Sequence, residues 1–206
     1  DKIAEVEGTT RDILIAERTV LNFLQRLSGI ATQTATYVDK VKNYKARITD
    51  TRKTTPTLRV LEKYAVRVGG GYNHRMGLYD TVLIKDNHIR AAGGIKPALN
   101  TIKEQISHTT KIEIEVEDLD GVKQALQAGA DIIMLDNMNP SQMETAVAEI
   151  EDRAIVEASG GITLNNLKEI AATGVDVISI GALTHQIHSL DLSLDLAPPG
   201  SELRYV

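Results

Sequence analysis

Six short runs of β-branched and apolar residues, separated in the later half by helical segments, constrain the fold of this 206-residue chain most strongly. Segments 121–130, 141–150 and 163–174 between the later runs place apolar residues at helical spacing. Strand, helix and strand in alternation predict βαβ units and a parallel sheet. The runs are residues 46–52 (ARITDTR), 81–87 (TVLIKDN), 111–118 (KIEIEVED), 130–138 (ADIIMLDNM), 154–162 (AIVEASGGI) and 175–183 (VDVISIGAL).

The arrangement of that sheet follows from what the sequence lacks. No GxGxxG motif follows the first run, which removes the main dinucleotide-binding signature of a doubly wound sheet. We therefore expect an α/β fold with parallel strands in a (β/α) TIM-like barrel. The barrel would be irregular or incomplete because six strands fall short of eight, unless a further strand lies in the glycine-rich residues 68–74 (VGGGYNH).

Two local features of the helices are also predicted. Residues 13–44 form a long helical region, which we expect to be two helices that meet near Ser28 and Gly29. Thr163 is expected to cap the helix of residues 163–174, because threonine is favoured at that position.

Composition excludes some classes of protein. The chain has no cysteine, so disulfides and thiolate metal sites are excluded, which fits a reducing compartment such as the cytoplasm. No apolar run approaches the ~18 residues of a membrane span, so we expect no membrane partner.

Charge is distributed unevenly along the chain. The formal net charge is −5, yet residues 40–96 hold 13 Lys or Arg against 4 Asp or Glu. A local positive field suits an anionic ligand, although a solvated basic face is the simpler alternative. Aromatic residues make up only 3%, so a nucleic-acid partner, which would need bases stacked on aromatic rings, is not expected.

Polar and glycine residues end nearly every predicted strand. In βα architectures the carboxyl ends of parallel strands meet at one rim, which holds the active site. The sequence therefore predicts a single functional rim. Its candidate residues are Arg52, Lys53, Lys85, Glu115, Asp136, Ser159, Gly160 and Gly181.

The cations of this rim suggest an anionic substrate. Arg52, Lys53, His74, Arg75 and Lys85 together would suit a ligand with several negative groups, since arginine matches carboxylate or phosphate with a planar fork. Any one of them alone fits a surface cation that pairs with a nearby acid.

Two carboxylates could hold a divalent cation. Glu115 and Asp136 come from successive strands, and Mg²⁺ binds carboxylates while bridging to substrate phosphates. Asp136 interrupts the end of an apolar strand. The choice of Glu115 stays open on pattern alone, because Glu113, Glu115 and Glu117 alternate along one strand.

The last two strand ends resemble a phosphate site. ASGGIT runs into a helix and ISIGALTH ends the next strand. Backbone N–H groups at such glycine turns and helix starts bind phosphate, and in barrels this site forms from the last two strands.

These stretches together resemble one family, the quinolinate phosphoribosyltransferases, also called nicotinate-nucleotide pyrophosphorylases (carboxylating). The resemblance covers nearly the whole chain in order. Its most specific parts are TRKTTP, GGGYNHRMGL and LIKDNH, with AERTVLNFLQRLSGIAT, IEVED, IMLDNM, EASGGIT and ISIGALTH. It implies a pentosyltransferase that makes nicotinate mononucleotide from quinolinate and phosphoribosyl pyrophosphate, with Mg²⁺, releasing pyrophosphate and CO₂. This is a step of NAD biosynthesis.

The resemblance also implies a role for each rim residue. Arg52, His74, Arg75 and Lys85 would hold the two quinolinate carboxylates, together with Arg18 from a neighbouring subunit. Lys53, Glu115 and Asp136 would act in catalysis on phosphoribosyl pyrophosphate, with Glu115 and Asp136 as the metal ligands. Ser159, Gly160 and Gly181 would bind the 5-phosphate. The matching motif favours Glu115 over Glu113 and Glu117.

Family members carry an α/β sandwich domain before the barrel. Residues 1–12 are then expected to be the remnant of that domain, and residues 13–206 the catalytic barrel with its N-terminal helices. We expect a homodimer or higher homo-oligomer, and impaired activity without the preceding domain. The alternatives are a related barrel acting on another pyridine carboxylate and a non-catalytic anion-binding barrel.

Overall fold

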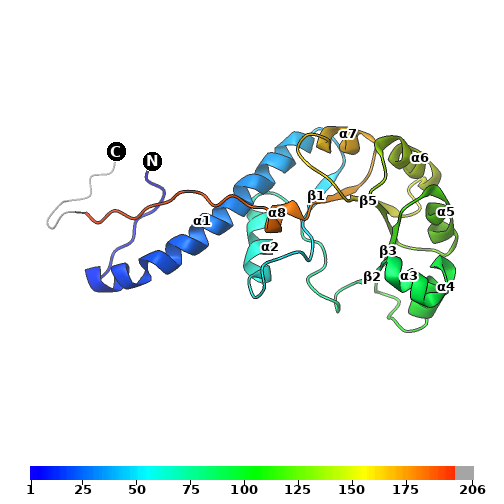
Figure 1. The fold of residues 1–206 in the computed structure, drawn as a ribbon, viewed down its shortest axis with the longest axis horizontal. Coiled ribbons are helices and arrows are strands. Elements are labelled where there is room, and N and C mark those ends of the chain that lie inside the picture. The colour runs from blue at the N-terminus through cyan, green and yellow to red at the C-terminus, as the bar shows by residue number, and fades with distance from the viewer. Residues whose placement is uncertain (198–206) are drawn as a thin grey trace.

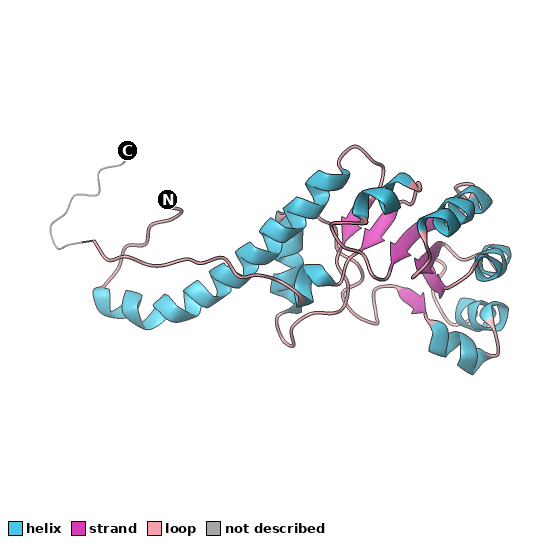
Figure 2. Ribbon diagram, turned by 45° about the horizontal axis from the view of Figure 1, so that its top comes forward, coloured by secondary structure: helices cyan, strands magenta, loops and turns pink. Residues whose placement is uncertain are grey.

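The sheet of this protein consists of six parallel strands. The computed structural model describes residues 1–197. The strands pair in the order β1-β6-β5-β4-β3-β2, so the first two strands lie at opposite edges (Figures 1 and 2). Each of the six predicted runs contains one strand, and the expected α/β fold is confirmed. The strands are β1 (Arg47–Thr49), β2 (Val82–Ile84), β3 (Ile112–Val116), β4 (Ile132–Asp136), β5 (Ile155–Ser159) and β6 (Val177–Ser179).

Helices cover the outer side of this sheet. In Figure 1 the helices α4 to α7 follow one another in an arc around the strands. The three predicted later helices correspond to α5, α6 and α7. The helices are α1 (Thr10–Val41), α2 (Arg59–Val68), α3 (Asp86–Ala92), α4 (Ile95–Lys103), α5 (Leu119–Gln127), α6 (Pro140–Ile150), α7 (Leu167–Ala172) and α8 (Ala182–His185).

The sheet is an open barrel. Among the described residues β1 and β2 do not pair, so the sheet does not close. The glycine-rich segment supplies a single parallel bridge instead of a strand: Tyr72 pairs with Thr49, and its N–H donates to Ile48 O at 2.8 Å. Residues 73–81 then run from this edge to β2, past the mouth of the barrel.

The prediction of two N-terminal helices was wrong. Helix α1 runs without interruption from Thr10 to Val41 through Gly29. A side chain at Gly29 would lie 2.2 Å from the carbonyl oxygen of His188, so glycine here permits the C-terminal segment to pass close to the helix. A glycine inside a helix costs about 1 kcal/mol relative to alanine, which packing can offset without a break.

The start of α7 also differs from the prediction. The helix begins at Leu167 with Asn166 at the N-cap position, three residues after Thr163. The side chain of Asn166 accepts a hydrogen bond from Thr163 N at 2.8 Å. This bond stabilises a turn at residues 163–166, so the helix begins only after that turn.

The two faces of the sheet differ in chemistry. Side chains that point outward, such as Ile133, Leu135 and Ile178, are fully buried against the helices and form the apolar core. Side chains that point inward include Glu115 and Asp136. Burial of the outward-facing apolar side chains stabilises the fold, so the inward-facing positions can carry polar side chains.

Among residues 1–197, no helix combines the length and hydropathy required to cross a membrane.

Candidate active site

A cavity of about 610 Å³ opens at the carboxyl ends of the strands. It contains ten of the eleven predicted site residues; the eleventh, Arg18, lies outside it. These ten residues thus lie together as expected, whereas their roles remain predictions. The ten are Arg52, Lys53, His74, Arg75, Lys85, Glu115, Asp136, Ser159, Gly160 and Gly181.

The strand register explains which side chains face the cavity. Glu115 lies beside Met134, and Met134 beside Glu157, so these three form one level of the barrel interior. Asp136 and Ser159 pair at the next level toward the rim. Residues two apart in a strand share a face, which places Glu113 one level deeper than Glu115.

The ambiguity among the three alternating glutamates is resolved by this register. Glu113 is buried in the interior of the barrel, Glu115 lines the cavity, and Glu117 is exposed beyond the strand. Glu115 is thus the one of the three that reaches the open part of the cavity.

The loop after β1 carries Arg52 and Lys53 and is fixed by hydrogen bonds to its backbone. Thr184 in α8 donates through Oγ1 to Lys53 O at 2.6 Å. Arg59 in α2 donates to Arg52 O at 3.2 Å. Glu62, which is fully buried, accepts from Thr55 N at 3.0 Å. The backbone is held from behind while the two cationic side chains remain exposed at the rim.

His74 lies in the floor of the cavity between two buried glutamates. Its Nε2 is 3.2 Å from a carboxylate oxygen of Glu113 and 3.5 Å from one of Glu157. Burial alone would lower the pKa of His74, but hydrogen bonds to the two carboxylates and their charge outweigh it and raise the pKa to about 10. Burial, with the charge of Glu157, raises the pKa of Glu113.

The other ring nitrogen of His74 is also engaged. The backbone N–H of Arg75 donates to Nδ1 at 2.8 Å, which requires a lone pair there, whereas the carboxylates favour a second proton on the ring. The Arg75 N–H disfavours a proton on Nδ1, whereas the carboxylates favour one there. Both are compatible with a proton on Nε2, which faces the glutamates. His74 therefore contacts a substrate carboxylate only if it leaves one of these partners.

Arg75 adds a partly buried cationic group beside this floor. Its guanidinium donates to Thr81 O at 3.3 Å, while Nε is buried without a hydrogen-bond partner in the described structure. Burial lowers the pKa of Arg75, and the nearby charge of Arg52 lowers it further. A buried donor without a partner costs free energy, which an anionic ligand would recover.

Lys85 and Glu115 form an ion pair across neighbouring strand ends. Lys85 follows β2 at the start of α3, and Glu115 belongs to β3. The pair joins a predicted quinolinate residue to a predicted catalytic residue.

The opposite wall contains the glycine turn after β5. Gly160 has φ +92°, and a Cβ there would lie 2.2 Å from Oδ1 of Asn137. Only glycine accommodates both constraints. Asn137 donates in turn to Asp136 Oδ2 at 2.8 Å, so the turn and the rim carboxylate are in direct contact with the same side chain.

The predicted metal ligands fit a hard divalent cation in their chemistry. Glu115 and Asp136 offer carboxylate oxygens from adjacent strands that line the same cavity. A second group, His74 with Glu113 and Glu157, also brings ligand atoms within 4.8 Å of one another. It fits a metal less well, because ligation through Nε2 would require a proton on Nδ1, where Arg75 N–H donates.

Sequence reasoning missed Glu157 as a site residue. It is 4% exposed and lines the cavity, and in the described structure its Oε1 makes no polar contact closer than the 3.5 Å to Nε2 of His74. The signal was available, because Glu157 precedes Ser159 by two residues and therefore shares its face. The run AIVEASGGI was interpreted only at its glycine end.

Arg18 lies on the N-terminal half of α1, away from the cavity. Its side chain is 71% exposed and is 3.8 Å from Glu17. Figure 1 shows this half of α1 extending beyond the barrel, and the neighbouring side chains of Leu14, Ile15 and Phe23 are exposed.

Comparison with known proteins identifies similar sequences along the whole described chain. Residues 30–195 match the model of the quinolinate phosphoribosyl transferase C-terminal domain, and residues 1–28 match that of the N-terminal domain. The chain is 50% identical over 194 residues to the probable nicotinate-nucleotide pyrophosphorylase [carboxylating] of Bacillus subtilis, covering 94% of this chain and 67% of that protein. For the Methanocaldococcus jannaschii protein of the same name, identity is 51% over 203 residues, covering 94% and 71%.

Solved structures show the same fold. The nicotinate-nucleotide pyrophosphorylase from Francisella tularensis is 49% identical and superimposes with a TM-score of 0.87, covering 90% of this chain and 66% of that one. NadC from Streptococcus pyogenes gives a TM-score of 0.86 at 47% identity, covering 89% and 65%. The chain thus spans about two thirds of the length of these relatives.

Proposed function

The chain belongs to the quinolinate phosphoribosyl transferase family, and we propose that its cavity transfers a phosphoribosyl group from phosphoribosyl pyrophosphate to quinolinate with loss of CO₂. The observation that carries this proposal is the composition of the cavity. A cationic side, two rim carboxylates and a glycine phosphate cradle lie within one space of about 610 Å³.

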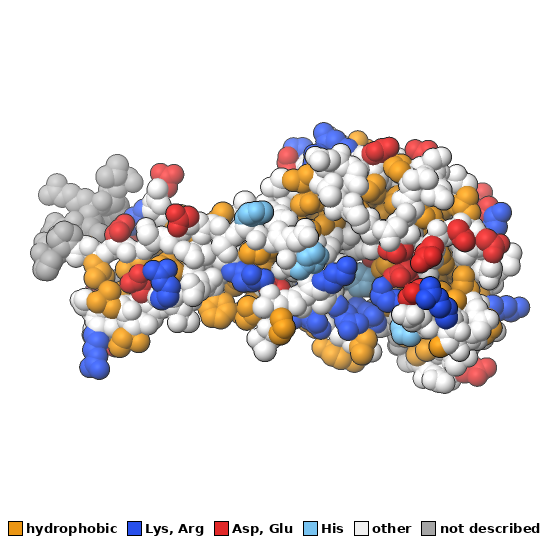
Figure 3. Space-filling model, in the orientation of Figure 1, with side chains coloured by type: hydrophobic (Ala, Val, Ile, Leu, Met, Phe, Trp, Pro, Cys, Tyr) orange, Lys and Arg blue, Asp and Glu red, His pale blue; other side chains and the backbone are white. Residues whose placement is uncertain are grey.

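The cationic side fits a planar dicarboxylate. Arg52 and Arg75 each present a guanidinium that can match a carboxylate in two places, and Lys85 adds a point charge. Figure 3 shows Lys and Arg side chains gathered in the middle of one face of the molecule, beside a group of Asp and Glu. His74 completes the floor beneath them.

The opposite side fits the phosphoribosyl group. Ser159, Gly160 and Gly181 supply backbone N–H groups at the ends of β5 and β6 for the 5-phosphate. Glu115 and Asp136 would hold Mg²⁺, which when bound offsets negative charge on the diphosphate.

Bond formation then follows from this placement. The ring nitrogen of quinolinate donates its electron pair to C1 of the ribose, and the bond from C1 to the pyrophosphate oxygen breaks with its pair on that oxygen. Positive charge develops on the sugar, where the carboxylates of Glu115 or Asp136 offset it. Negative charge develops on the leaving group, where Lys53 at the rim offsets it.

Loss of CO₂ completes the reaction. The ring nitrogen is now a cationic pyridinium and draws electrons from the neighbouring carbon. The bond to the adjacent carboxylate breaks, CO₂ leaves, and the carbon takes up a proton. The carboxylate that leaves is the one on the ring carbon next to the nitrogen, and Arg52 and Arg75 would hold the ring with that nitrogen facing C1 of the ribose.

We further propose that a second copy of the chain contributes Arg18. The exposure of Arg18 and of the apolar side chains around it supports an interface at this half of α1. Mixing an Arg18→Ala chain with a Lys53→Ala chain should restore part of the activity, because each mixed pair then holds one intact cavity. No recovery would contradict the shared site. The cytoplasmic location stays a prediction.

The reaction is tested by supplying quinolinate, phosphoribosyl pyrophosphate and Mg²⁺ and measuring nicotinate mononucleotide and CO₂. Formation of both nicotinate mononucleotide and CO₂ supports the proposal. Product with another pyridine carboxylate and none with quinolinate would favour a related transferase. Binding of both substrates without turnover would favour an anion-binding barrel.

A further inference from the structure

A fully buried ion pair lies directly behind the cavity. Asp50 is 0% exposed and Lys63 is 1% exposed, and the Nζ of Lys63 contacts Oδ1 of Asp50. Neither side chain lines the cavity. The desolvation of two buried charges commonly exceeds their attraction, so such a pair is weak evidence for added stability. Its role must be sought in what the two charges hold.

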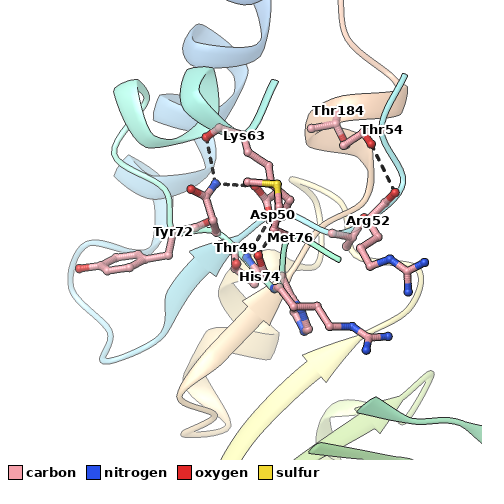
Figure 4. Close-up of polar contacts among 12 residues, drawn as sticks. Thr49, Asp50, Arg52, Thr54, Lys63, Tyr72, His74, Met76 and Thr184 are labelled. Carbon is pink, nitrogen blue, oxygen red and sulfur yellow. Dashed lines mark hydrogen bonds and ion pairs between the residues drawn. The ribbon is translucent and has the colours of Figure 1, made fainter. Parts of the chain in front are cut away.

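They hold the backbone of His74 from both sides. Asp50 Oδ1 accepts from His74 N at 2.8 Å, and Lys63 Nζ donates to His74 O at 2.9 Å. Asn73 joins the same group, donating through Nδ2 to Asp50 Oδ2 at 2.6 Å and to Lys63 O at 2.9 Å. Figure 4 shows Asp50, Lys63 and His74 close together, to the left of Arg52. Bonds to charged groups are stronger than neutral ones and fix position more tightly.

The pair also connects the two segments that carry the cavity's arginines. Asp50 immediately follows β1 and precedes Arg52 by two residues, while the segment it holds continues into Arg75. Arg59, one turn before Lys63 on α2, donates to Arg52 O at 3.2 Å and to Met76 O at 3.0 Å. The backbone at Arg52 and on both sides of Arg75 is therefore held by residues behind the cavity.

We propose that Asp50 and Lys63 are positioning residues that set the spacing between Arg52 and Arg75 for a substrate with two carboxylates. The inference rests on the proposed function for its ligand. The geometry itself, a charged clamp on the backbone of His74, does not depend on that function.

The test removes both charges together, so that neither is left buried without its partner. The variant is Asp50→Asn with Lys63→Met, which nearly preserves side-chain volume. Its matched control makes the same two changes in an exposed ion pair, Asp39→Asn with Lys42→Met, whose side chains are 73% and 63% exposed. Four quantities are measured: the melting temperature, the Kd of quinolinate, the Kd of ribose 5-phosphate, and the amide hydrogen exchange of His74 and Arg75.

We expect the buried-pair variant to raise the Kd of quinolinate by about tenfold or more, since small misplacements of binding groups are costly. Exchange at His74 and Arg75 should accelerate by a similar factor. The Kd of ribose 5-phosphate should stay within about twofold, because its cradle lies on other strands. The control should change none of these quantities.

Two results would overturn the proposal. Unchanged quinolinate affinity and unchanged exchange would show that the pair positions nothing. A parallel loss of melting temperature and of both affinities would show a purely structural role. If the unaltered chain binds no quinolinate, the proposed function fails, and the exchange of His74 still decides whether the clamp exists.

A milder variant covers the case in which the double variant does not fold. Asn73→Ala removes the exposed member of the group and leaves both charges paired. We expect the same pattern with a smaller change, namely faster exchange at His74 and a rise in the Kd of quinolinate alone. Asn100→Ala, on α4, is its control.

Discussion

Lys85 and Glu115 form an ion pair although the proposed function places them on different substrates. A quinolinate carboxylate that binds Lys85 competes with Glu115 for the same ammonium group. Its arrival would release Glu115 toward the sugar and the metal. The pair therefore couples the two halves of the cavity, and quinolinate binding should increase the affinity for phosphoribosyl pyrophosphate.

Removing the charge of Glu115 tests this coupling. In Glu115→Gln we expect quinolinate to bind several-fold more tightly, because Lys85 loses its competing partner, while turnover falls by about 100-fold as transition-state stabilisation is lost. Calorimetry and initial rates measure the two effects. Glu117→Gln is the control, since Glu117 is exposed and outside the cavity. Weaker quinolinate binding in Glu115→Gln would contradict the coupling.

Lys53 should act on the leaving group and leave quinolinate affinity nearly unchanged. Lys53→Ala is expected to lower kcat by about 100-fold, because one charged donor to the developing diphosphate is removed. The Kd of quinolinate should change less than about threefold, since Lys53 is exposed and solvent screens the charge of exposed groups. Lys96→Ala on α4 provides the control. A loss confined to quinolinate affinity would assign Lys53 to the other substrate.

Arg75 should show the reverse pattern. Arg75→Ala is expected to raise the Kd of quinolinate by about 10- to 100-fold, as a partly buried charge-assisted contact is removed. Arg75→Lys should recover little of this affinity, because lysine lacks the planar fork. Arg90→Ala, whose side chain is 73% exposed on α3, is the matched control. Full affinity in the lysine variant would show that charge alone is required.

Gly160 and Gly161, the two glycines of the turn after β5, distinguish the effect of steric space from that of backbone conformation. Both have positive φ, +92° at Gly160 and +60° at Gly161, but a Cβ at Gly161 meets nothing within 4 Å. Gly161→Ala should cost about 1 kcal/mol of unfolding free energy from backbone strain alone. Gly160→Ala should cost more and weaken ribose 5-phosphate binding, because the new Cβ displaces Asn137. Equal effects in thermal melts and phosphate titrations would argue against the steric role.

The stability contributed by His74 should depend on pH. Its folded pKa of about 10 lies above the ordinary value of 6.5. The contribution is therefore fully present below about pH 6.5 and is lost as the pH rises through about 10. The difference in melting temperature between the native chain and His74→Gln should narrow across this window. A constant difference would show that the Arg75 N–H keeps Nδ1 unprotonated throughout.

Much of the fold could be predicted from the spacing of apolar residues and from the polar and glycine residues that end each strand. The six strands were predictable because each is a short β-branched run that ends in polar or glycine residues, and this same feature indicated eight of the residues that line the cavity. The unbroken α1 was not predictable from Gly29. Whether a glycine ends a helix or admits a close neighbour depends on the His188 segment, more than 150 residues away.

The interior of the site was the least predictable part. Nothing local in the sequence shows that Glu113 and Glu157 both face His74, since the three residues come from distant segments and meet only through the sheet register. The Asp50–Lys63 pair was hidden for the same reason. Asp50 lies within the first β-branched run, and no motif in the sequence indicates that Lys63 is its partner.

The most direct test of the account compares quinolinate with nicotinate, which lacks the second carboxylate, by calorimetric titration of the unaltered chain. If Arg52, Arg75 and Lys85 form a site for two carboxylates, quinolinate should bind at least about tenfold more tightly, a difference of about 1.4 kcal/mol. Arg75→Ala should remove most of that preference. Equal binding of the two acids, or binding of neither, would contradict the central claim that this cavity is assembled to recognise a pyridine dicarboxylate.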